Sequence, residues 1–328
     1  MENRPLLSIC IPTCNRAHYL RECLDSIVAQ FNDPEVRDNV EVVISDNASS
    51  DNTCELAEEY CKKFNNIKYF RNNKNVGFDL NVINVVEKAN GEYCWYMGDD
   101  DVIGGNNLRF VVDFLKKYDI AAFTFKSAPL EEIDRFVKNK ILEGATIRVN
   151  SPDEFLLRGY CPGIFSVLGF QRDLWLEALD KNDITVGWLY HEVILKMIPR
   201  AKSQFVYFNY QIVFTRKNDA NRVENGAELF YWIHLIKMFK KMMGFGYNRK
   251  TTDVAIRNHA RSLPLMLCRA KGHDLDCSMS NLRLLYKEFY KSPVYLRLYL
   301  FLAVFIFFIP NKMIKIIRDV RKEIYAAK

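Results

Sequence analysis

The sequence predicts an α/β fold in which helices flank a mainly parallel sheet, followed by a helical C-terminal extension. Two observations predict it. Through the first 125 residues, short apolar runs alternate with segments whose apolar residues recur at helical spacing. From about residue 227 onward, the apolar spacing is helical throughout. Repeated strand–helix units build parallel sheets with right-handed crossovers, and such sheets bind ligands outside the carboxyl ends of their strands.

The expected elements follow one another closely along the chain. Residues 6–11 are apolar, and the next apolar residues recur at helical spacing up to Val28. The same pattern predicts strands at residues 40–45, 67–70, 93–97 and 120–125, and helices after Asp51 and at residues 80–89 and 104–118. Beyond them we expect a hairpin near residues 142–146, short helices within residues 151–200 and a strand at residues 204–214.

Composition and charge exclude several classes of protein. Hydrophobic residues make up 49% and charged residues 26% of the 328, so we expect a buried core rather than disorder. Residues 291–328 contain eight Lys or Arg and two Asp or Glu, and their net charge of +6 equals that of the whole chain. The first 290 residues therefore balance at 38 basic (46 − 8) against 38 acidic (40 − 2), which argues against a nucleic-acid partner.

The cysteines and the N-terminal residues predict a cytoplasmic protein. The chain has nine cysteines, an odd number, and no Cys-x-x-Cys pair. Cys10, Cys23 and Cys94 lie within apolar runs, where a reduced thiol behaves as a small core residue. The first residues lead directly into a strand-like run and lack the pattern of a signal peptide.

Glycine is absent from the first 76 residues, because Gly77 is the first in the chain. The dinucleotide fingerprint and the phosphate-binding P-loop both need glycines at the first strand-to-helix turn, where bare backbone approaches phosphate. Both are therefore excluded. A nucleotidyltransferase that wraps phosphates in a Gly-rich loop after its first strand is disfavoured for the same reason.

Polar side chains follow the first two predicted strands. Thr13 and Asn15 come directly after the first strand, and Asp46 begins the loop after the second. At the carboxyl edge of a parallel sheet, such groups are placed to bind a base or a ribose. The alternative for Thr13 or Asn15 is a helix N-cap. Ser50 or Asp51 can cap the next helix, which leaves Asp46 without a structural explanation.

A second polar group, Asn75, Gly77 and Asn81, opens the predicted helix at residues 80–89. Gly77 suits a backbone with positive φ, and the asparagine amides are able to read the edge of a base. The alternative is that these residues only form the start of the helix.

Three consecutive carboxylates, Asp99, Asp100 and Asp101, end the apolar strand at residues 93–97. Adjacent carboxylates repel one another unless a cation or solvent relieves the charge. Mg²⁺ and Mn²⁺ bind through one or two such groups while bridging substrate phosphates. The alternative is a solvated loop or an N-cap for the next helix, but arrival on an apolar strand favours a metal site.

Four motifs in this order resemble one family. Ile-Pro-Thr-Cys-Asn-Arg, Ser-Asp-Asn-Ala-Ser-Ser-Asp, Asn-Val-Gly and Gly-Asp-Asp-Asp together are similar to GT-A glycosyltransferases of family 2, in particular to bacterial abequosyltransferase-like enzymes. The resemblance covers residues 5–125 strongly and residues 151–215 weakly. It implies a GT-A fold, a nucleotide-diphosphate-sugar donor, a divalent metal and inversion at the anomeric carbon.

The resemblance also assigns roles to residues. It implies that Asp99 approaches the ribose and that Asp100, our first choice, or Asp101 binds Mg²⁺ or Mn²⁺. Gly98 stands where an Asp-x-Asp-Asp motif has its first Asp, so the ligating carboxylate is open. The residues that it implies for the nucleoside pocket are Pro12, Thr13, Asn15 and Asp46.

Inversion requires a base on the acceptor side of the site. The family often places an acidic pair at a helix start there, and His191 and Glu192 occupy that place. Glu192 is our first choice, His191 the second and Asp183 the third. The alternative is a packed histidine beside a surface glutamate.

The C-terminal tail predicts contact with a membrane. Residues 298–309 are apolar but too short to span a bilayer. Beyond Pro310 an apolar stripe runs along a helix rich in Lys and Arg, a pattern typical of the inner face of an anionic plasma membrane. The stripe consists of Met313, Ile316, Ile317, Val320 and Ile324, and the basic residues around it are Lys312, Lys315, Arg318, Arg321 and Lys322. Packing within a soluble helical core is the alternative.

These observations predict the organisation of the chain. We expect a GT-A domain at residues 1–215, with a nucleotide-sugar half at 1–125 and an acceptor half at 126–215. A helical region follows at 216–328, with a membrane-associating tail from about residue 293. The predicted function is transfer of a sugar to a saccharide acceptor, polyprenyl-linked, in bacterial surface-polysaccharide synthesis. The alternatives are a metal-dependent nucleotidyltransferase and a non-catalytic sugar-nucleotide-binding or membrane-scaffold protein.

Overall fold

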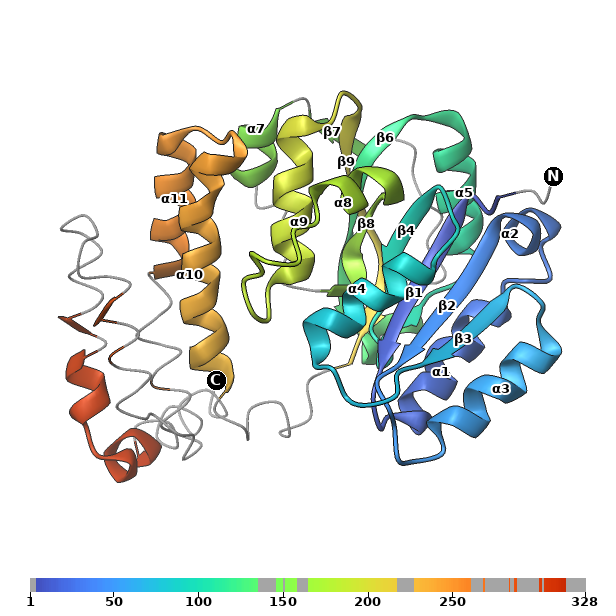
Figure 1. Cartoon of the computed structure of the whole chain (residues 1–328), viewed down its shortest axis with the longest axis horizontal. Helices are drawn as coiled ribbons and strands as arrows, with labels where there is room; N and C mark the ends of the chain where they lie inside the picture. Colours follow the sequence, from blue (N-terminus) through green and yellow to red (C-terminus); the bar gives the residue numbers. More distant parts are fainter. Residues whose placement is uncertain are drawn as a thin grey trace. The chain divides into compact units, whose positions relative to one another are not determined.

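The chain divides into two compact units. The first consists of Met1–Asp183 and Leu189–Lys217, and the second of Ile184–Trp188 and Asn218–Lys328. Figure 1 shows the elements of the computed structural model along the chain. The structure describes residues 4–134, 146–149, 151–157, 165–216, 227–260, 301–302 and 304–316, together with Cys268, Arg283, Tyr286 and Lys287.

The first unit is built on one sheet of nine strands among the described residues. Their order is β3-β2-β1-β4-β8-β6-β9-β5, and β7 also pairs with β9. Six strands point the same way, whereas β5, β7 and β8 run antiparallel to their neighbours. The strands are β1 (Leu7–Thr13), β2 (Val40–Asp46), β3 (Ile67–Arg71), β4 (Tyr93–Tyr96), β5 (Val102–Ile103), β6 (Ile120–Pro129), β7 (Thr146–Val149), β8 (Leu168–Gln171) and β9 (Gln204–Thr215). The predicted α/β fold with a mainly parallel sheet is confirmed.

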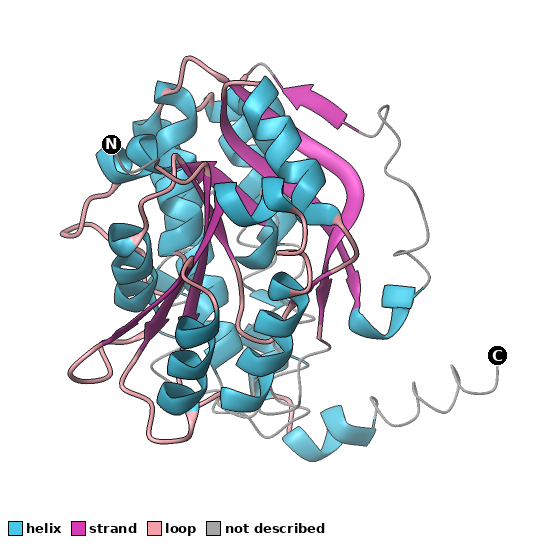
Figure 2. Ribbon diagram, turned by 90° about the vertical axis from the view of Figure 1, so that its right-hand side faces the viewer, coloured by secondary structure: helices cyan, strands magenta, loops and turns pink. Residues whose placement is uncertain are grey.

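Helices cover both faces of this sheet, as Figure 2 shows. Right-handed crossovers place α1 and α3 on one face of β1–β3, and the return connection places α4 on the other, against β1 and β2. Short 3₁₀ turns lie at Leu130–Glu132, Phe165–Val167 and Ile198–Arg200. The helices of the first unit are α1 (Ala17–Val28), α2 (Pro34–Asn39), α3 (Thr53–Lys63), α4 (Phe78–Lys88), α5 (Asn107–Lys117), α7 (Pro152–Leu157), α8 (Arg172–Ala178) and α9 (Leu189–Met197).

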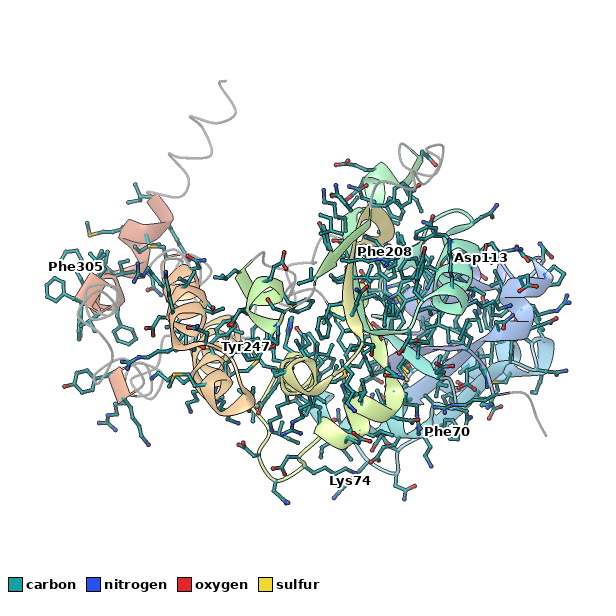
Figure 3. The ribbon with its side chains drawn as sticks, turned by 90° about the horizontal axis from the view of Figure 1, so that it is seen from above. Phe70, Lys74, Asp113, Phe208, Tyr247 and Phe305 are labelled. Atoms are coloured by element: carbon teal, nitrogen blue, oxygen red, sulfur yellow. The ribbon has the colours of Figure 1, made fainter. Side chains whose placement is uncertain are left out.

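An aromatic cluster joins α5 to strands β9 and β6. Phe208 of β9 lies 5.4 Å from Phe110 and 4.8 Å from Phe114 of α5, measured between ring centroids. On the neighbouring strand, Phe125 stacks on Phe208 at 5.2 Å. In Figure 3 the labelled Phe208 lies among densely packed side chains. Offset and edge contacts of this kind each contribute about 0.5–1.5 kcal/mol beyond the burial of area.

The second unit contains helices in its described part. α10 (Ala227–Phe245) and α11 (Arg249–Ala260) pack against each other. This agrees with the helical spacing of the sequence from about residue 227. Further helical residues are described at 301–302, 304–308 and 311–316.

Three elements of the first unit were not expected from the sequence. α2 begins at Pro34, where the Asp33 carboxylate accepts a hydrogen bond from the Glu35 amide at 2.9 Å. β5 has two residues and β8 has four, too few for a periodic pattern to be visible. The hairpin expected near residues 142–146 lies almost wholly outside the described residues, which resume with β7 at residue 146.

Candidate active site

The strand order places a switch point at the carboxyl ends of β1 and β4, where open α/β sheets form a crevice. β1 pairs with β2 on one side and with β4 on the other, although β3 and α4 come between β2 and β4 in the chain. The pairing of β1 with β4 ends at Cys10 and Tyr96, and the last bond runs from the Met97 amide to the Cys10 carbonyl at 2.9 Å. Pro12, which has no amide hydrogen, follows on β1. Open α/β sheets bind their ligands at such a switch point.

The acidic turn, defined here as Gly98–Asp101, is tied to β1 across this crevice. The Thr13 hydroxyl donates to one oxygen of Asp99 at 2.7 Å. Nη1 of Arg16 donates to the other oxygen of Asp99 at 3.0 Å and to an oxygen of Asp100 at 2.9 Å. The structure therefore brings together Thr13, Asp99 and Asp100 of the predicted site, and adds Arg16, which the sequence did not single out.

Burial and charge oppose each other in this group. Burial raises the pKa of Asp99, and the Asp100 carboxylate also raises it, while Arg16 and the Thr13 hydroxyl lower it. The net direction is upward. For Arg16, burial lowers the pKa, but Asp99 and Asp100 raise it more, so the guanidinium stays charged. A cation is thus already part of the site.

The atoms around Gly98 explain why this position has no side chain. A Cβ at this position would lie 3.0 Å from Oδ1 of Asp100, 3.1 Å from Oδ2 of Asp101 and 3.1 Å from the Ser166 hydroxyl. These oxygens converge on one point, and a side chain there would displace them. The Ser166 hydroxyl accepts from the Gly98 amide at 2.8 Å and donates to Asp101. Ser166 therefore fixes the acidic turn from the 3₁₀ turn Phe165–Val167, which precedes β8.

This donor set suits a divalent metal that also binds a ligand. Among the residues that the structure describes, no group of three or more His, Cys, Asp or Glu is arranged to hold a metal alone. Mg²⁺ and Mn²⁺ at nucleotide sites need fewer, because substrate phosphates complete their coordination. Asp100 and Asp101 present one oxygen each to the space beside Gly98. Two converging carboxylates and a hydroxyl fit such an ion.

An asparagine network joins the loops after β2 and β3 to the start of α4. Nδ2 of Asn47 donates to Oδ1 of Asn75 at 2.9 Å and to the Gly77 carbonyl at 3.3 Å. Asn72 donates to both Asn47 and Asn81, at 3.2 and 2.9 Å. Gly77 has a φ of 85°, as its place before α4 predicted. The predicted Asn75, Gly77 and Asn81 thus lie together, with Asn47 and Asn72 joining them.

Asn81 also ties α4 to the ends of β1 and β2. The Ser45 hydroxyl donates to its Oδ1 at 2.7 Å, and its Nδ2 donates to the Ser45 carbonyl at 2.9 Å and to the Thr13 carbonyl at 3.5 Å. The residue is buried. The Thr13 carbonyl and hydroxyl therefore connect the asparagine network with the acidic turn.

Asp46 holds its own loop in shape. It is fully buried, and its carboxylate accepts from the Ser49 amide at 2.9 Å and from the Tyr69 hydroxyl at 2.7 Å. These bonds supply the structural explanation that the sequence lacked. Its contact with a base stays a prediction. Asn15 is exposed, has a φ of 54°, and accepts from the Ser50 amide at 2.6 Å, so it links two loops instead of capping α1.

The first turn of α9 carries His191 and Glu192. Both side chains are buried, and Glu192 is 1% exposed, so it is not a surface glutamate. Nζ of Lys196 lies 3.4 Å from the Glu192 carboxylate and 4.0 Å from that of Asp183. Asp183, the third candidate base, therefore lies near Glu192, the first, because Lys196 contacts both carboxylates.

Aromatic rings connect α9 with the acidic turn. The Tyr190 ring lies 6.3 Å from that of Tyr96, the last residue of β4, and 5.2 Å from that of Phe165. Phe165 precedes Ser166, which bonds to Asp101. Phe78 at the start of α4 packs on Phe165 at 5.6 Å. The start of α9 therefore packs against the end of β4 and the start of α4.

Five contributors to this site were missed at the level of sequence. One of them, Asn72, directly follows β3. Arg16 stands in the Pro-Thr-Cys-Asn-Arg motif, three residues beyond the end of β1, and that position was the available signal. Asn47 follows Asp46 directly, with the same signal. Ser166 and Lys196 come from distant segments, and only the fold brings them to the site.

The tail in the second unit exposes apolar side chains. Phe305 and Phe308 are 63% and 67% exposed, and Figure 3 shows Phe305 projecting from its segment. Phe301, Met313 and Ile316 are also exposed. Within the described part of the chain, no helix has the length and apolar content to cross a bilayer. The expected stripe residues Ile317, Val320 and Ile324, and the basic residues Arg318, Arg321 and Lys322, lie outside the described residues.

Residues 8–167 match the sequence profile of glycosyl transferase family 2. The abequosyltransferase of Salmonella typhimurium is 41% identical over 204 residues, which are 58% of this chain and 60% of that protein. Matches to three curated relatives span between 23% and 60% of their lengths, so the chain spans less than two thirds of each.

Solved structures share the fold. The chain is similar to TarS 1–349 of S. aureus in complex with UDP-GlcNAc, with a TM-score of 0.66 and 16% identity over 97% of this chain and 92% of that one. It is similar to the mannosyltransferase PcManGT of Pyrobaculum calidifontis in complex with GDP-Man and Mn²⁺, with a TM-score of 0.57 and 15% identity over 97% and 88%. The predicted GT-A-like architecture is confirmed by this likeness of fold.

Proposed function

Since residues 8–167 belong to glycosyl transferase family 2, we propose that this chain transfers a sugar from a nucleotide-diphosphate donor to a saccharide acceptor. One observation carries the proposal. The carboxylates of Asp99 and Asp100 lie at the β1–β4 switch point, bonded to Thr13 and Arg16. Nucleotides bind at this place in α/β sheets, and the chain has no glycine loop upstream with which to hold phosphate.

The donor lies along the crevice from β2 to β4. Its base packs on Pro12 and Asn15 and is read by the amide of Asn75. Asn81 supports this pocket by holding α4 to the ends of β1 and β2. Asp46 keeps the loop after β2 in place beneath the base, and Asp99 receives the ribose hydroxyls. Support comes from the bonds that already connect these groups, since the ends of β1, β2 and α4 form one continuous wall.

Asp100, with Asp101, holds a divalent metal together with the donor diphosphate. Mg²⁺ or Mn²⁺, when bound there, would neutralise the charge that develops on the leaving diphosphate. The oxygens that converge beside Gly98 support this assignment, and the P. calidifontis mannosyltransferase was solved with Mn²⁺. Ser166 orients Asp101 through its hydroxyl.

Glu192 acts as the base. It accepts the proton of the acceptor hydroxyl while that oxygen attacks the anomeric carbon, and the bond from this carbon to the diphosphate oxygen breaks. Attack from the face opposite the leaving group inverts the configuration. The aromatic contacts of Tyr190 support this role, because they anchor the start of α9 beside the crevice. His191 is the second candidate.

The acceptor is a saccharide on a polyprenyl carrier, in bacterial surface-polysaccharide synthesis. The exposed rings of Phe301, Phe305 and Phe308, with Lys312 and Lys315 close by in the chain, favour contact with the inner face of an anionic plasma membrane. Deletion of residues 293–328 should release the protein from vesicles that contain anionic lipid. Unchanged partitioning would exclude this part of the proposal.

Calorimetric titration with a panel of nucleotide sugars, with and without Mn²⁺, tests donor binding. At least one nucleotide sugar should bind in the presence of Mn²⁺, and Asp100→Asn should weaken that binding at least about tenfold, because a carboxylate ligand is lost. The matched control is Asp38→Asn, an exposed aspartate of α2 that pairs with Arg37. Binding by no member of the panel would count against the proposal.

A transfer assay distinguishes the role of Glu192 as the base from a role in donor binding. Glu192→Gln should bind the donor as the natural chain does, but release nucleoside diphosphate at least about a hundredfold more slowly, since general-base catalysis contributes 10²–10⁴-fold. Full transfer activity in this variant would remove Glu192 from the mechanism. Release of pyrophosphate instead of nucleoside diphosphate would indicate a nucleotidyltransferase.

A further inference from the structure

Arg16 bridges two of the carboxylates that we assign to ribose and metal. A single nitrogen, Nη1, lies 3.0 Å from Oδ1 of Asp99 and 2.9 Å from Oδ2 of Asp100. The Thr13 hydroxyl bonds to the remaining oxygen of Asp99. Three of the four carboxylate oxygens of this pair therefore accept hydrogen bonds from the protein.

We propose that the positive charge of Arg16 lowers the affinity of the acidic turn for a divalent metal until a donor diphosphate binds, so that metal binding depends on the donor. This inference rests on the function proposed above. It assigns to Arg16 the role of a positioning residue that controls when Asp100 becomes a metal ligand.

Charge makes the guanidinium and the metal competitors. Asp99, Asp100 and Arg16 together carry a net charge of −1, whereas the two carboxylates alone carry −2. A divalent ion bound to Asp100 would be repelled by the Arg16 guanidinium, which is bonded to the same carboxylate. At about 4 Å, two unit charges near a protein surface interact by several kcal/mol, so the repulsion is large compared with thermal energy. Without a diphosphate to take up Arg16, metal affinity is low.

A diphosphate offers Arg16 another partner. Guanidinium groups bind phosphate oxygens in paired, charge-assisted hydrogen bonds. The Arg16 side chain is 34% exposed, so part of it faces solvent, where a ligand would arrive. Its guanidinium also lies 5.5 Å from the centroid of the Tyr19 ring, which supports the side chain from one side. Movement of the guanidinium from the carboxylates to the diphosphate removes its positive charge from Asp100 in the same event.

A neighbouring arginine provides a matched control. Cζ of Arg216 lies 5.0 Å from the centroid of the same Tyr19 ring, but its ion-pair partner is Glu22 rather than the acidic turn. Removal of the Arg216 charge changes the same neighbourhood without removing a hydrogen bond to Asp99 or Asp100.

The experiment measures Mn²⁺ alone, without nucleotide, through the electron paramagnetic resonance signal of the free ion. Arg16→Gln should bind Mn²⁺ at least about tenfold more tightly than the natural chain, and Arg216→Gln within about twofold of it. The double variant Arg16→Gln with Asp100→Asn should lose the gain. Circular dichroism confirms folding, and Arg16→Met, which keeps the apolar stem, replaces a glutamine variant that fails to fold.

The outcomes separate this inference from the proposed function. Equal or weaker Mn²⁺ binding by Arg16→Gln and Arg16→Met would show that Arg16 only balances buried charge, and would overturn the inference while leaving donor binding untouched. A gain that survives in the double variant would place the ion elsewhere and would also overturn it. Failure of the natural chain to bind any nucleotide sugar with Mn²⁺ is the separate failure of the proposed function.

Discussion

The substitution Thr13→Val removes the hydrogen bond that joins β1 to the acidic turn. The hydroxyl lies 2.7 Å from Oδ2 of Asp99, and both residues are buried. A hydrogen bond to a charged group contributes about 1.5–3 kcal/mol, and valine fills nearly the same space. We therefore expect the free energy of unfolding to fall by about 2 kcal/mol at neutral pH.

The pKa of Asp99 determines how the stability loss of Thr13→Val depends on pH. Burial raises the pKa of Asp99 in the folded state, and loss of the Thr13 hydroxyl, which lowers it, raises it further. Because the folded-state pKa is higher than the unfolded value of 3.8, ionised Asp99 destabilises the fold at any pH above the folded-state pKa. This destabilisation disappears as the pH falls below 3.8, where Asp99 is protonated in both states. The deficit of Thr13→Val should therefore be largest at neutral pH and shrink in acid.

Urea unfolding followed by tryptophan fluorescence measures the change, because Trp95 and Trp175 are buried in the first unit. Thr124→Val is the matched control. Thr124 is 1% exposed, and its hydroxyl has no hydrogen-bond partner among the described residues. Its replacement should change stability by less than about 0.5 kcal/mol or increase it. Equal losses in the two variants would refute the assigned role of the Thr13–Asp99 bond.

Two further predictions concern the sheet. Burial raises the pKa of Glu41, but hydrogen bonds from Lys68 and Ser8 lower it below 4.5 overall, so Glu41→Gln should cost about 2 kcal/mol at neutral pH. That loss should disappear as the pH falls through the lowered pKa, in urea unfolding at a series of pH values; a constant difference down to about pH 3 would contradict it. Gly169→Ala places a Cβ 1.9 Å from the Phe123 ring, so overpacking should cost about 1–3 kcal/mol, seen as a lower Tm. An unchanged Tm would show that the ring moves freely.

The alternation of β1–β4 with their helices was readable from the sequence because each element is long enough to show its period. β1 has seven residues, all buried, and α1 has twelve with a clear apolar face. The same pattern placed Asp99–Asp101 at the end of a strand. β8 was not readable, because its four residues run antiparallel between β4 and β6 and include Gly169, which gives no apolar signal.

The sequence predicted several residues of the site, but it did not predict their hydrogen-bond partners. Asn75, Gly77 and Asn81 lie together as expected, since the carboxyl ends of adjacent strands meet at one edge. The bond of Arg16 to Asp99 and Asp100 spans more than eighty residues of chain, and no local pattern encodes it. Asp46 shows the opposite case, because a carboxylate that looked free in the sequence is bonded to Ser49 and Tyr69.

The direct measurement is a crystal structure with Mn²⁺ and the nucleotide that binds in the titration panel, with the ion located by its anomalous signal. The account predicts the ion on a carboxylate oxygen of Asp100 and between the two phosphates. It also predicts the base against Pro12 and Asn75, and the guanidinium of Arg16 turned from Asp100 toward the diphosphate. An ion bound away from the Asp99–Asp101 turn, or a nucleotide outside the β1–β4 crevice, would contradict it.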